Sequence, residues 1–90
     1  MMATIVTYDI PSKHMEFKRM MFLLGYKDQI AGTTCKVIYF PNTTLYHPTK
    51  NAVTARDEAR NIAKRLEVNL ERCVATIWDD WATICGEPFK

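Results

Sequence analysis

The sequence lacks the short motifs that identify many enzymes. It contains no P-loop, G-x-S-x-G, G-x-G-x-x-G or H-E-x-x-H pattern. It also lacks a long hydrophobic run, since no apolar stretch approaches the ~20 residues needed to cross a membrane. The first residues show neither the basic nor the apolar region of a signal peptide. We therefore expect no membrane partner and a cytoplasmic location.

Cysteine is scarce, and its spacing is uninformative. Cys35, Cys73 and Cys85 form no C-x-x-C pair and leave an odd thiol. A structural zinc site and a disulfide scaffold are therefore not expected. Each cysteine lies in or beside an apolar run, which favours buried core thiols.

A strong charge of one sign is also missing. Twelve Lys and Arg against ten Asp and Glu give a formal charge of +2, too little to indicate nucleic-acid binding by itself. Eleven basic against seven acidic residues give residues 1–72 a charge of +4, and one against three give residues 73–90 a charge of −2. This asymmetry permits phosphate binding, and solvated faces with an incidental imbalance explain it equally well.

The length predicts one domain, residues 1–90. A hydrophobic share of 48% excludes intrinsic disorder. A chain of this size buries only about 60–65% of its unfolded surface, so a partner subunit would add to a marginal core.

Hydrophobic periodicity predicts alternating strands and helices. One amphipathic helix is expected over Lys13–Leu24, with Ser12 as its N-cap and Gly25 at its end. A second is expected from the capping-box-like Thr54–Asp57 to Leu66. Runs of β-branched and aromatic residues predict strands over Ala3–Ile10, Cys35–Phe40, Thr43–His47 and Cys73–Trp78, with an extra short C-terminal strand over Trp81–Cys85.

This order of elements favours an α+β fold of the ferredoxin-like βαββαβ kind, an antiparallel sheet with two helices on one face. In the first strand Thr4, Val6, Tyr8 and Ile10 share one face. Apolar residues occupy both faces of the later strands, so the face without helices needs a cover. A second copy of the chain is the simplest cover, and we predict a homodimer.

Two side chains near the end of the first strand are candidate catalytic residues. Asp9 ends that strand, and a two-fold dimer would bring two copies of Asp9 together around Mg²⁺. His14 lies near the first helix start, within reach of a general-acid role beside Asp9. The alternatives stay open: Asp9 caps a loop, and His14 is a surface residue. Asp79 and Asp80 are either metal oxygens or a solvated turn.

Basic side chains on the two helices are candidate phosphate contacts. Acidic neighbours interrupt them, which equally suits an ordinary solvated face. The sheet aromatics do not fit an RNA-recognition motif and are better read as core or interface. The candidate nucleic-acid-binding residues are Lys13, Lys18, Arg19, Arg56, Arg60, Lys64 and Arg65.

A first strand ending in Val6-Thr7-Tyr8-Asp9-Ile10, then a loop and a helix bearing Lys18-Arg19, resembles a known family. It is similar to the small CRISPR-associated endonuclease of spacer adaptation and to the virulence-associated protein D group. The resemblance implies a ferredoxin-like homodimer in which the Asp ending the first strand, here Asp9, has a metal-linked role. It also implies that a C-terminal strand, here Trp81–Cys85, crosses to the partner's sheet.

Two hypotheses follow. The first is a homodimeric metal-dependent endoribonuclease or nucleic-acid-associated protein, with Asp9 as the Mg²⁺ ligand, His14 beside it, and RNA or DNA held by the basic residues. The alternative is a non-catalytic ferredoxin-like dimer that binds a protein or a small regulatory ligand. Fold alone does not decide between them.

Overall fold

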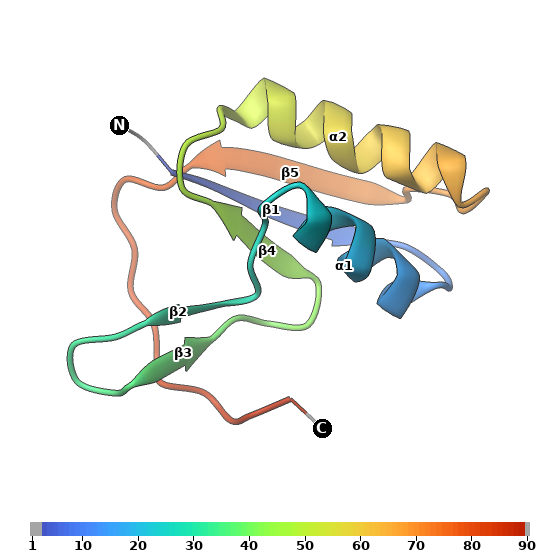
Figure 1. The fold of residues 1–90 in the computed structure, drawn as a ribbon. Coiled ribbons are helices and arrows are strands. Elements are labelled where there is room, and N and C mark those ends of the chain that lie inside the picture. The colour runs from blue at the N-terminus through green and yellow to red at the C-terminus, as the bar shows by residue number, and fades with distance from the viewer. Residues whose placement is uncertain (1–2, 90) are drawn as a thin grey trace.

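This computed structural model describes residues 3–89, which contain two helices and five short strands joined by loops (Figure 1). The predicted α+β class is confirmed. No helix within these residues is long and apolar enough to span a membrane. The elements are β1 (Thr4–Asp9), α1 (His14–Leu23), β2 (Gln29–Ala31), β3 (Val37–Tyr39), β4 (Thr44–His47), α2 (Ala52–Arg65) and β5 (Arg72–Ile77).

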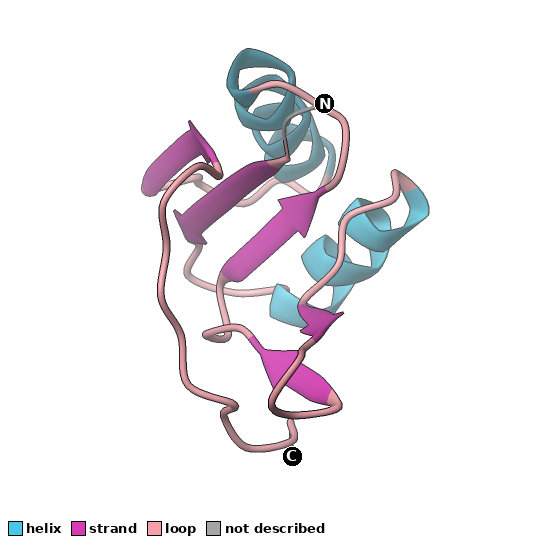
Figure 2. Ribbon diagram, turned by 90° about the vertical axis from the view of Figure 1, so that its left-hand side faces the viewer, coloured by secondary structure: helices cyan, strands magenta, loops and turns pink. Residues whose placement is uncertain are grey.

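Strand β1 is the centre of the main sheet. It pairs antiparallel with β4 on one side and with β5 on the other, giving the order β4-β1-β5 (Figure 2). Strands β2 and β3 form a separate antiparallel pair. The expected strand over Cys35–Phe40 therefore exists only as β3, outside the main sheet. Its partner β2 was not predicted, because three residues carry too little alternation to stand out from a loop.

Both helices pack on one face of the sheet. The predicted alternation in β1 is confirmed, since Thr4, Val6 and Tyr8 are buried while Ile5, Thr7 and Asp9 are half-buried or exposed. The core joins the buried face of the sheet to α1 and α2 and contains Val6, Tyr8, Ile10, Phe17, Met21, Tyr26, Leu45, Ala55, Ala59, Ile62 and Ala63. Small alanines on α2 let that helix approach the sheet closely.

Both helix starts differ from the sequence prediction. Helix α1 begins after Lys13, which has a left-handed backbone (φ 60°), so Ser12 is not its N-cap. Helix α2 begins two residues earlier than expected, because the Asn51 side chain accepts a hydrogen bond from the Thr54 backbone N–H at 2.8 Å. The predicted end of α1 is confirmed: Gly25 has φ +95°, and a side chain there would meet the His47 ring.

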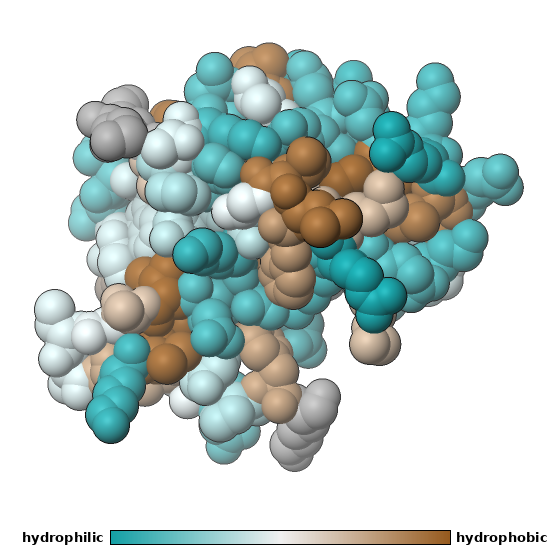
Figure 3. All heavy atoms as spheres, in the orientation of Figure 1, coloured by the Kyte–Doolittle hydropathy of each residue, from teal (hydrophilic) through white to brown (hydrophobic). Residues whose placement is uncertain are grey.

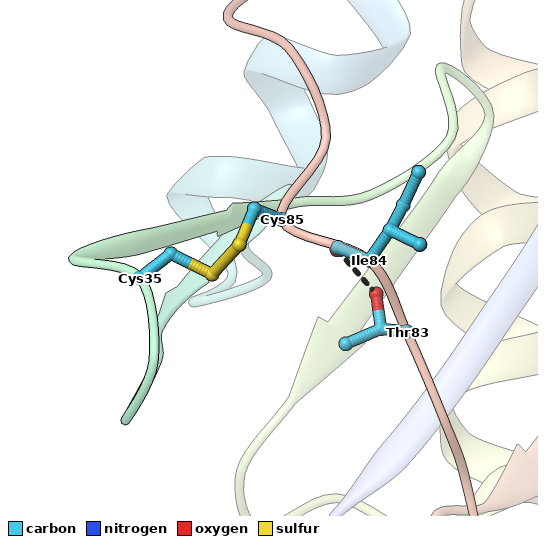
Figure 4. The surroundings of a disulfide bond; sticks show 4 residues. All are labelled: Cys35, Thr83, Ile84 and Cys85. Carbon is cyan, nitrogen blue, oxygen red and sulfur yellow. Dashed lines mark hydrogen bonds between the residues drawn. A yellow bond between two sulfur atoms is a disulfide. The ribbon is translucent and has the colours of Figure 1, made fainter.

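A disulfide joins Cys35 to Cys85, with Cα atoms 6.0 Å apart (Figure 4). The expectation of buried core thiols is therefore wrong for these two residues. Sequence spacing did not show the pairing, because it arises when the C-terminal tail folds back onto the β2–β3 hairpin. Cys73 is free and half-buried.

The C-terminal tail, residues 78–89, runs from β5 to the hairpin without forming a strand (Figure 2). The additional strand expected over Trp81–Cys85 is therefore absent from the described residues. One backbone hydrogen bond ties the tail to β3, from the Tyr39 N–H to the Cys85 carbonyl at 3.1 Å. The Phe89 ring lies edge-on to Tyr39. The disulfide and these contacts fix the tail, a task that strand pairing would otherwise perform.

The tail also covers part of the sheet face that the helices leave open. Trp78 contacts Phe40 and Tyr46, with ring centroids 5.8 Å and 5.3 Å apart. Trp81 packs on Trp78 at 4.4 Å. Some of the apolar residues expected to need a second subunit are therefore covered within the chain.

A polar cluster fastens α2 to the segment after α1. The buried Tyr26 hydroxyl donates to Glu58 at 2.7 Å, and the Lys50 ammonium donates to both Glu58 oxygens at 2.8 and 3.0 Å. His47 is also buried here, and its Nδ1 accepts from the backbone N–H groups of Thr49 and Lys50. These hydrogen bonds satisfy groups that would otherwise destabilise the interior.

The pKa values of this cluster follow from burial and pairing. Burial alone would raise the pKa of Glu58, but hydrogen bonds from Lys50 and Tyr26 outweigh it, so the pKa lies below its usual 4.5. Burial and the hydrogen bond to Glu58 raise the pKa of Tyr26. Burial, then the charge of Lys50, lowers the pKa of His47. Glu58 is therefore ionised, and Tyr26 and His47 are neutral, at pH 7.

The substitution Glu58→Gln is expected to lower the free energy of unfolding by about 1–2 kcal/mol at neutral pH. A lowered folded-state pKa stabilises above the unfolded pKa, and this contribution disappears as the pH falls through the acid range. Urea denaturation at neutral and acid pH should show the deficit shrinking toward acid. Glu67→Gln, at an exposed site, is the control and should change stability by less than about 0.5 kcal/mol. A deficit that is constant with pH would contradict the assignment.

Candidate functional site

Three adjoining depressions follow the end of the sheet at which β1 terminates. They measure about 330, 230 and 510 Å³. Tyr8 and Thr43 line both the first and the second, and Arg72 and Cys73 line both the second and the third. We call the three depressions together the furrow, because neighbouring members share lining residues at this end of the sheet. It contains six of the predicted site residues, namely Asp9, His14, Lys18, Arg56, Arg60 and Lys64.

The first depression lies between α1 and the turn before β4. Its lining includes His14 and Lys18 of α1 and Asn42 of the turn. The Tyr8 ring packs on Phe17 at 4.5 Å, and its hydroxyl is buried without a hydrogen-bond partner among the described residues. Burial, with a smaller effect from Asp28, raises the pKa of Tyr8 to about 12. Asn42 and Lys18 thus place an amide and a cation in this depression, where both can donate hydrogen bonds to a phosphate oxygen.

Asp9 lies in the second depression, opposite Arg72 of β5. The two residues are directly paired in the antiparallel register, and Arg72 Nε donates to Asp9 Oδ2 at 2.6 Å. Both side chains are largely exposed, 47% for Asp9 and 74% for Arg72, so the pair adds little to stability. The hydrogen bond that Arg72 donates to Asp9, and then the charge of Asp9, raise the pKa of Arg72. The carboxylate therefore has a cation already beside it.

The residues of one chain do not fit a magnesium ion at Asp9. Mg²⁺ needs several oxygen ligands in octahedral geometry, whereas Asp9 contributes the one carboxylate of its depression and pairs it with Arg72. Among the described residues, no group of three or more His, Cys, Asp or Glu side chains is placed to hold a metal. His14 and Asp9 line different depressions, and the hydrogen-bond partner of the Asp9 side chain among the described residues is Arg72, so a general-acid role of His14 beside Asp9 stays a prediction.

The third depression separates α2 from the exposed edge of β5. Arg56, Arg60 and Lys64 follow one another at four-residue spacing along its helical wall, and Arg72 stands on the strand side. Arg56 pairs with Asp57 at 3.0 Å. Arg60 and Lys64 have no ion-pair partner among residues 3–89, so their charges are available.

Cys73 lines the second and the third depression. Burial raises the pKa of its thiol, although Arg60 and Arg56 act in the opposite direction. The thiol is therefore protonated at pH 7 and unsuited to nucleophilic attack.

The remaining predicted basic residues lie outside the furrow. Lys13 donates to the Leu66 carbonyl at the end of α2 at 2.8 Å, a structural contact. Arg19 is exposed on α1, and Arg65 follows Lys64 by one residue, about 100° around the helix. Lys18 is shared: besides lining the first depression, it pairs with Asp28 at 3.4 Å.

Sequence reasoning missed three furrow residues: Tyr8 as an unpartnered donor, Arg72, and Cys73. Tyr8 gave no signal, because a strand tyrosine on the apolar face is indistinguishable from core. The Asp9–Arg72 pair depends on the register of β1 with β5, which links residues 63 positions apart. The sequence offered one signal for this pair, namely opposite charges at the end of the first strand and at the start of the last.

Comparison of this chain with protein-family models, curated proteins and solved structures finds no match. The resemblance to the CRISPR-associated endonuclease and the virulence-associated protein D group therefore stays a prediction, based on Tyr8-Asp9-Ile10 and the order of elements.

Proposed function

We propose that the protein binds nucleic acid along the furrow, through the sugar–phosphate backbone. One observation carries this function: the three depressions share lining residues around one end of the sheet, and each is lined by at least one of Lys18, Arg72, Arg60 and Lys64. Cations spaced along a groove neutralise successive phosphates and release counterions, which supplies most of the affinity for any sequence. Asn42 adds a hydrogen-bond donor at one end.

Hydrolysis is not part of this proposal. Asp9 is paired with Arg72, and one chain supplies no second carboxylate beside it. In the furrow Arg72 is shared between Asp9 and a backbone phosphate, since an arginine presents five donors. A magnesium site made by two copies of Asp9 across a dimer axis stays a prediction from the sequence.

We also propose that the sheet is a ferredoxin-like βαββαβ sheet in which the fourth strand, at one edge, is shortened to a single bridge. Strands β1, β4 and β5 occupy three of its four positions with the expected antiparallel pairing. At the free edge of β4, Lys27 and Tyr46 exchange two backbone hydrogen bonds of 2.9 Å. This bridge stands in the fourth position, and the chain then leaves the sheet to form the β2–β3 hairpin.

The homodimer is proposed through α1 rather than through the open sheet face. The tail already covers part of that face, whereas Met15 and Leu23 on α1 are 72% and 83% exposed. Phe22 lies on the same outer side, and Figure 3 shows apolar side chains gathered over α1. Packing two copies of this helix face buries side chains that water otherwise surrounds. The same surface supports the second candidate function, binding of another protein.

The disulfide bears on location. Disulfides persist in oxidising compartments and are rare in reducing cytosol. The Cys35–Cys85 bond therefore favours an oxidising compartment over the cytoplasm expected from the sequence.

Replacing both Arg60 and Lys64 by Gln is expected to weaken nucleic-acid binding and its salt dependence. Gln keeps the helix propensity and removes the charge. The slope of log affinity against log salt should flatten by about 1.4–1.8, because each lost phosphate contact removes about 0.7 for single strands and 0.9 for duplex. Fluorescence anisotropy with labelled RNA and DNA over a salt series measures it.

The matched control is Arg65→Gln, a neighbouring charge on α2 outside the furrow. It should leave the slope within about 0.3 of wild type, since it removes no proposed phosphate contact. A wild-type slope in the double variant, or an equal loss in the control, would show that the third depression does not hold the backbone.

Light scattering tests the dimer. The wild-type protein is expected to give a dimer mass at micromolar concentration, and Leu23→Asp a monomer mass, because a buried unpaired carboxylate disfavours the interface. Val53→Asp is the control: Val53 is 58% exposed on α2 and lies outside the proposed contact. A monomeric wild-type protein, or a dimeric Leu23→Asp variant, would contradict the proposed α1 interface.

A further inference from the structure

A second cavity lies at the opposite end of β1 from the furrow, on the open face of the sheet. It measures about 290 Å³, and its walls come from Ile5 of β1, the end of β5 and residues 78–83 of the tail. Three of its lining side chains are the aromatic rings of Phe40, Trp78 and Trp81. The chain contains two tryptophans, and both line this cavity.

The three rings stand at steep angles to one another. The planes of Phe40 and Trp78 meet at 76°, and those of Trp78 and Trp81 at 61°. Tyr46 supports Trp78 from the sheet at 77°. Rings at such angles pack edge to face on one another, and Trp81 keeps an exposed ring surface whose negative π-face attracts a cation without strong hydration.

Carboxylates stand at the rim of the cavity. Asp79 and Asp80 both line it, and neither has an ion-pair partner among the described residues. The lining contains no Lys, Arg or His. The field at the cavity is therefore negative from both the rings and the rim.

No cation from the described part of the chain fills this cage. The cation–π contacts found among residues 3–89 place Lys18 over Phe89 and Lys50 over Tyr26, both outside the cavity. Trp81 remains 47% exposed, so the cage is accessible from solvent.

We propose that this cavity binds a small organic cation bearing an alkylated ammonium group. Phe40, Trp78 and Trp81 provide the π-faces for the alkyl groups, and Asp79 and Asp80 provide long-range attraction at the rim. A trimethylammonium group suits the site because its charge is spread over carbons and its hydration is weak. A volume of about 290 Å³ suits a small molecule. This site is independent of nucleic-acid binding at the furrow.

The cage depends on the disulfide. Its tail wall, residues 78–83, is bounded on one side by β5 and on the other by Cys85, two residues beyond Thr83. Reduction of Cys35–Cys85 removes the covalent anchor and is expected to weaken the cation site without disrupting β1, β4 and β5.

Intrinsic tryptophan fluorescence reports directly on the site, because both tryptophans line it. Oxidised protein is titrated with choline at constant ionic strength. The parallel titration uses its neutral isostere, in which a tert-butyl group replaces trimethylammonium. Saturable fluorescence change with choline is expected, and at least about tenfold weaker binding of the isostere, since the isostere lacks the charge. Equal affinities, or no change with choline, would overturn the proposal.

Variants locate the site. Trp81→Leu keeps an apolar side chain but removes a π-face, and Asp80→Asn removes a rim charge. Each is expected to weaken choline binding several-fold, up to about tenfold for Trp81→Leu. Asp57→Asn, a carboxylate on α2 paired with Arg56, is the control and should bind as wild type. Unchanged binding in both Trp81→Leu and Asp80→Asn, with unchanged circular dichroism, would place the ligand elsewhere.

A peptide carrying trimethyllysine tests whether the alkylated ammonium group belongs to a small molecule or to a protein side chain. Binding no tighter than choline is expected, because the proposed contacts of the cavity are all with the alkylated ammonium group. Binding of the peptide more than about tenfold tighter than choline would overturn the assignment to a small molecule.

Discussion

One covalent bond, between Cys35 and Cys85, determines how about a quarter of this chain is placed. The main sheet and its helices are held by an ordinary buried core, but the tail and the β2–β3 hairpin have few ladder hydrogen bonds. Linking residues 50 positions apart removes unfolded-state entropy worth about 4 kcal/mol in the chain-entropy account. A 90-residue domain has a total stability of only about 5–15 kcal/mol. The bond is therefore a large part of what keeps the tail on the open face.

The tail separates two surfaces of opposite charge. At the end of β1 marked by Asp9, the furrow collects Lys18, Arg60, Lys64 and Arg72. At the other end, Asp79 and Asp80 rim an aromatic cavity. The formal charge of +2 for the whole chain does not show this separation. That separation supports the proposed polyanion binding at one end and the proposed cation binding at the other.

Local patterns predicted the helices, the faces of β1 and the Gly25 cap, because each depends on residues a few positions apart. The Asn51 cap was missed because Thr54 and Asp57 offered a competing capping pattern. Residues far apart in sequence were beyond such reasoning. The Cys35–Cys85 bond, the Asp9–Arg72 pair and the Phe40–Trp78–Trp81 cage all form only when the tail and β5 are in place. The same limit applies to the basic candidates on α2. Arg56, Arg60 and Lys64 follow one another at four-residue spacing and line the same depression, whereas no local pattern showed that Arg65 lies outside it.

The central claim is that the disulfide positions the tail and hairpin on a core that is stable without it. Hydrogen–deuterium exchange of the oxidised and the reduced protein, followed by mass spectrometry, tests this most directly. Reduction is predicted to speed exchange in residues 78–89 and in the β2–β3 hairpin, while β1, α2 and β5 keep their protection. Faster exchange spread evenly over the whole chain, or no change in the tail, would contradict the claim.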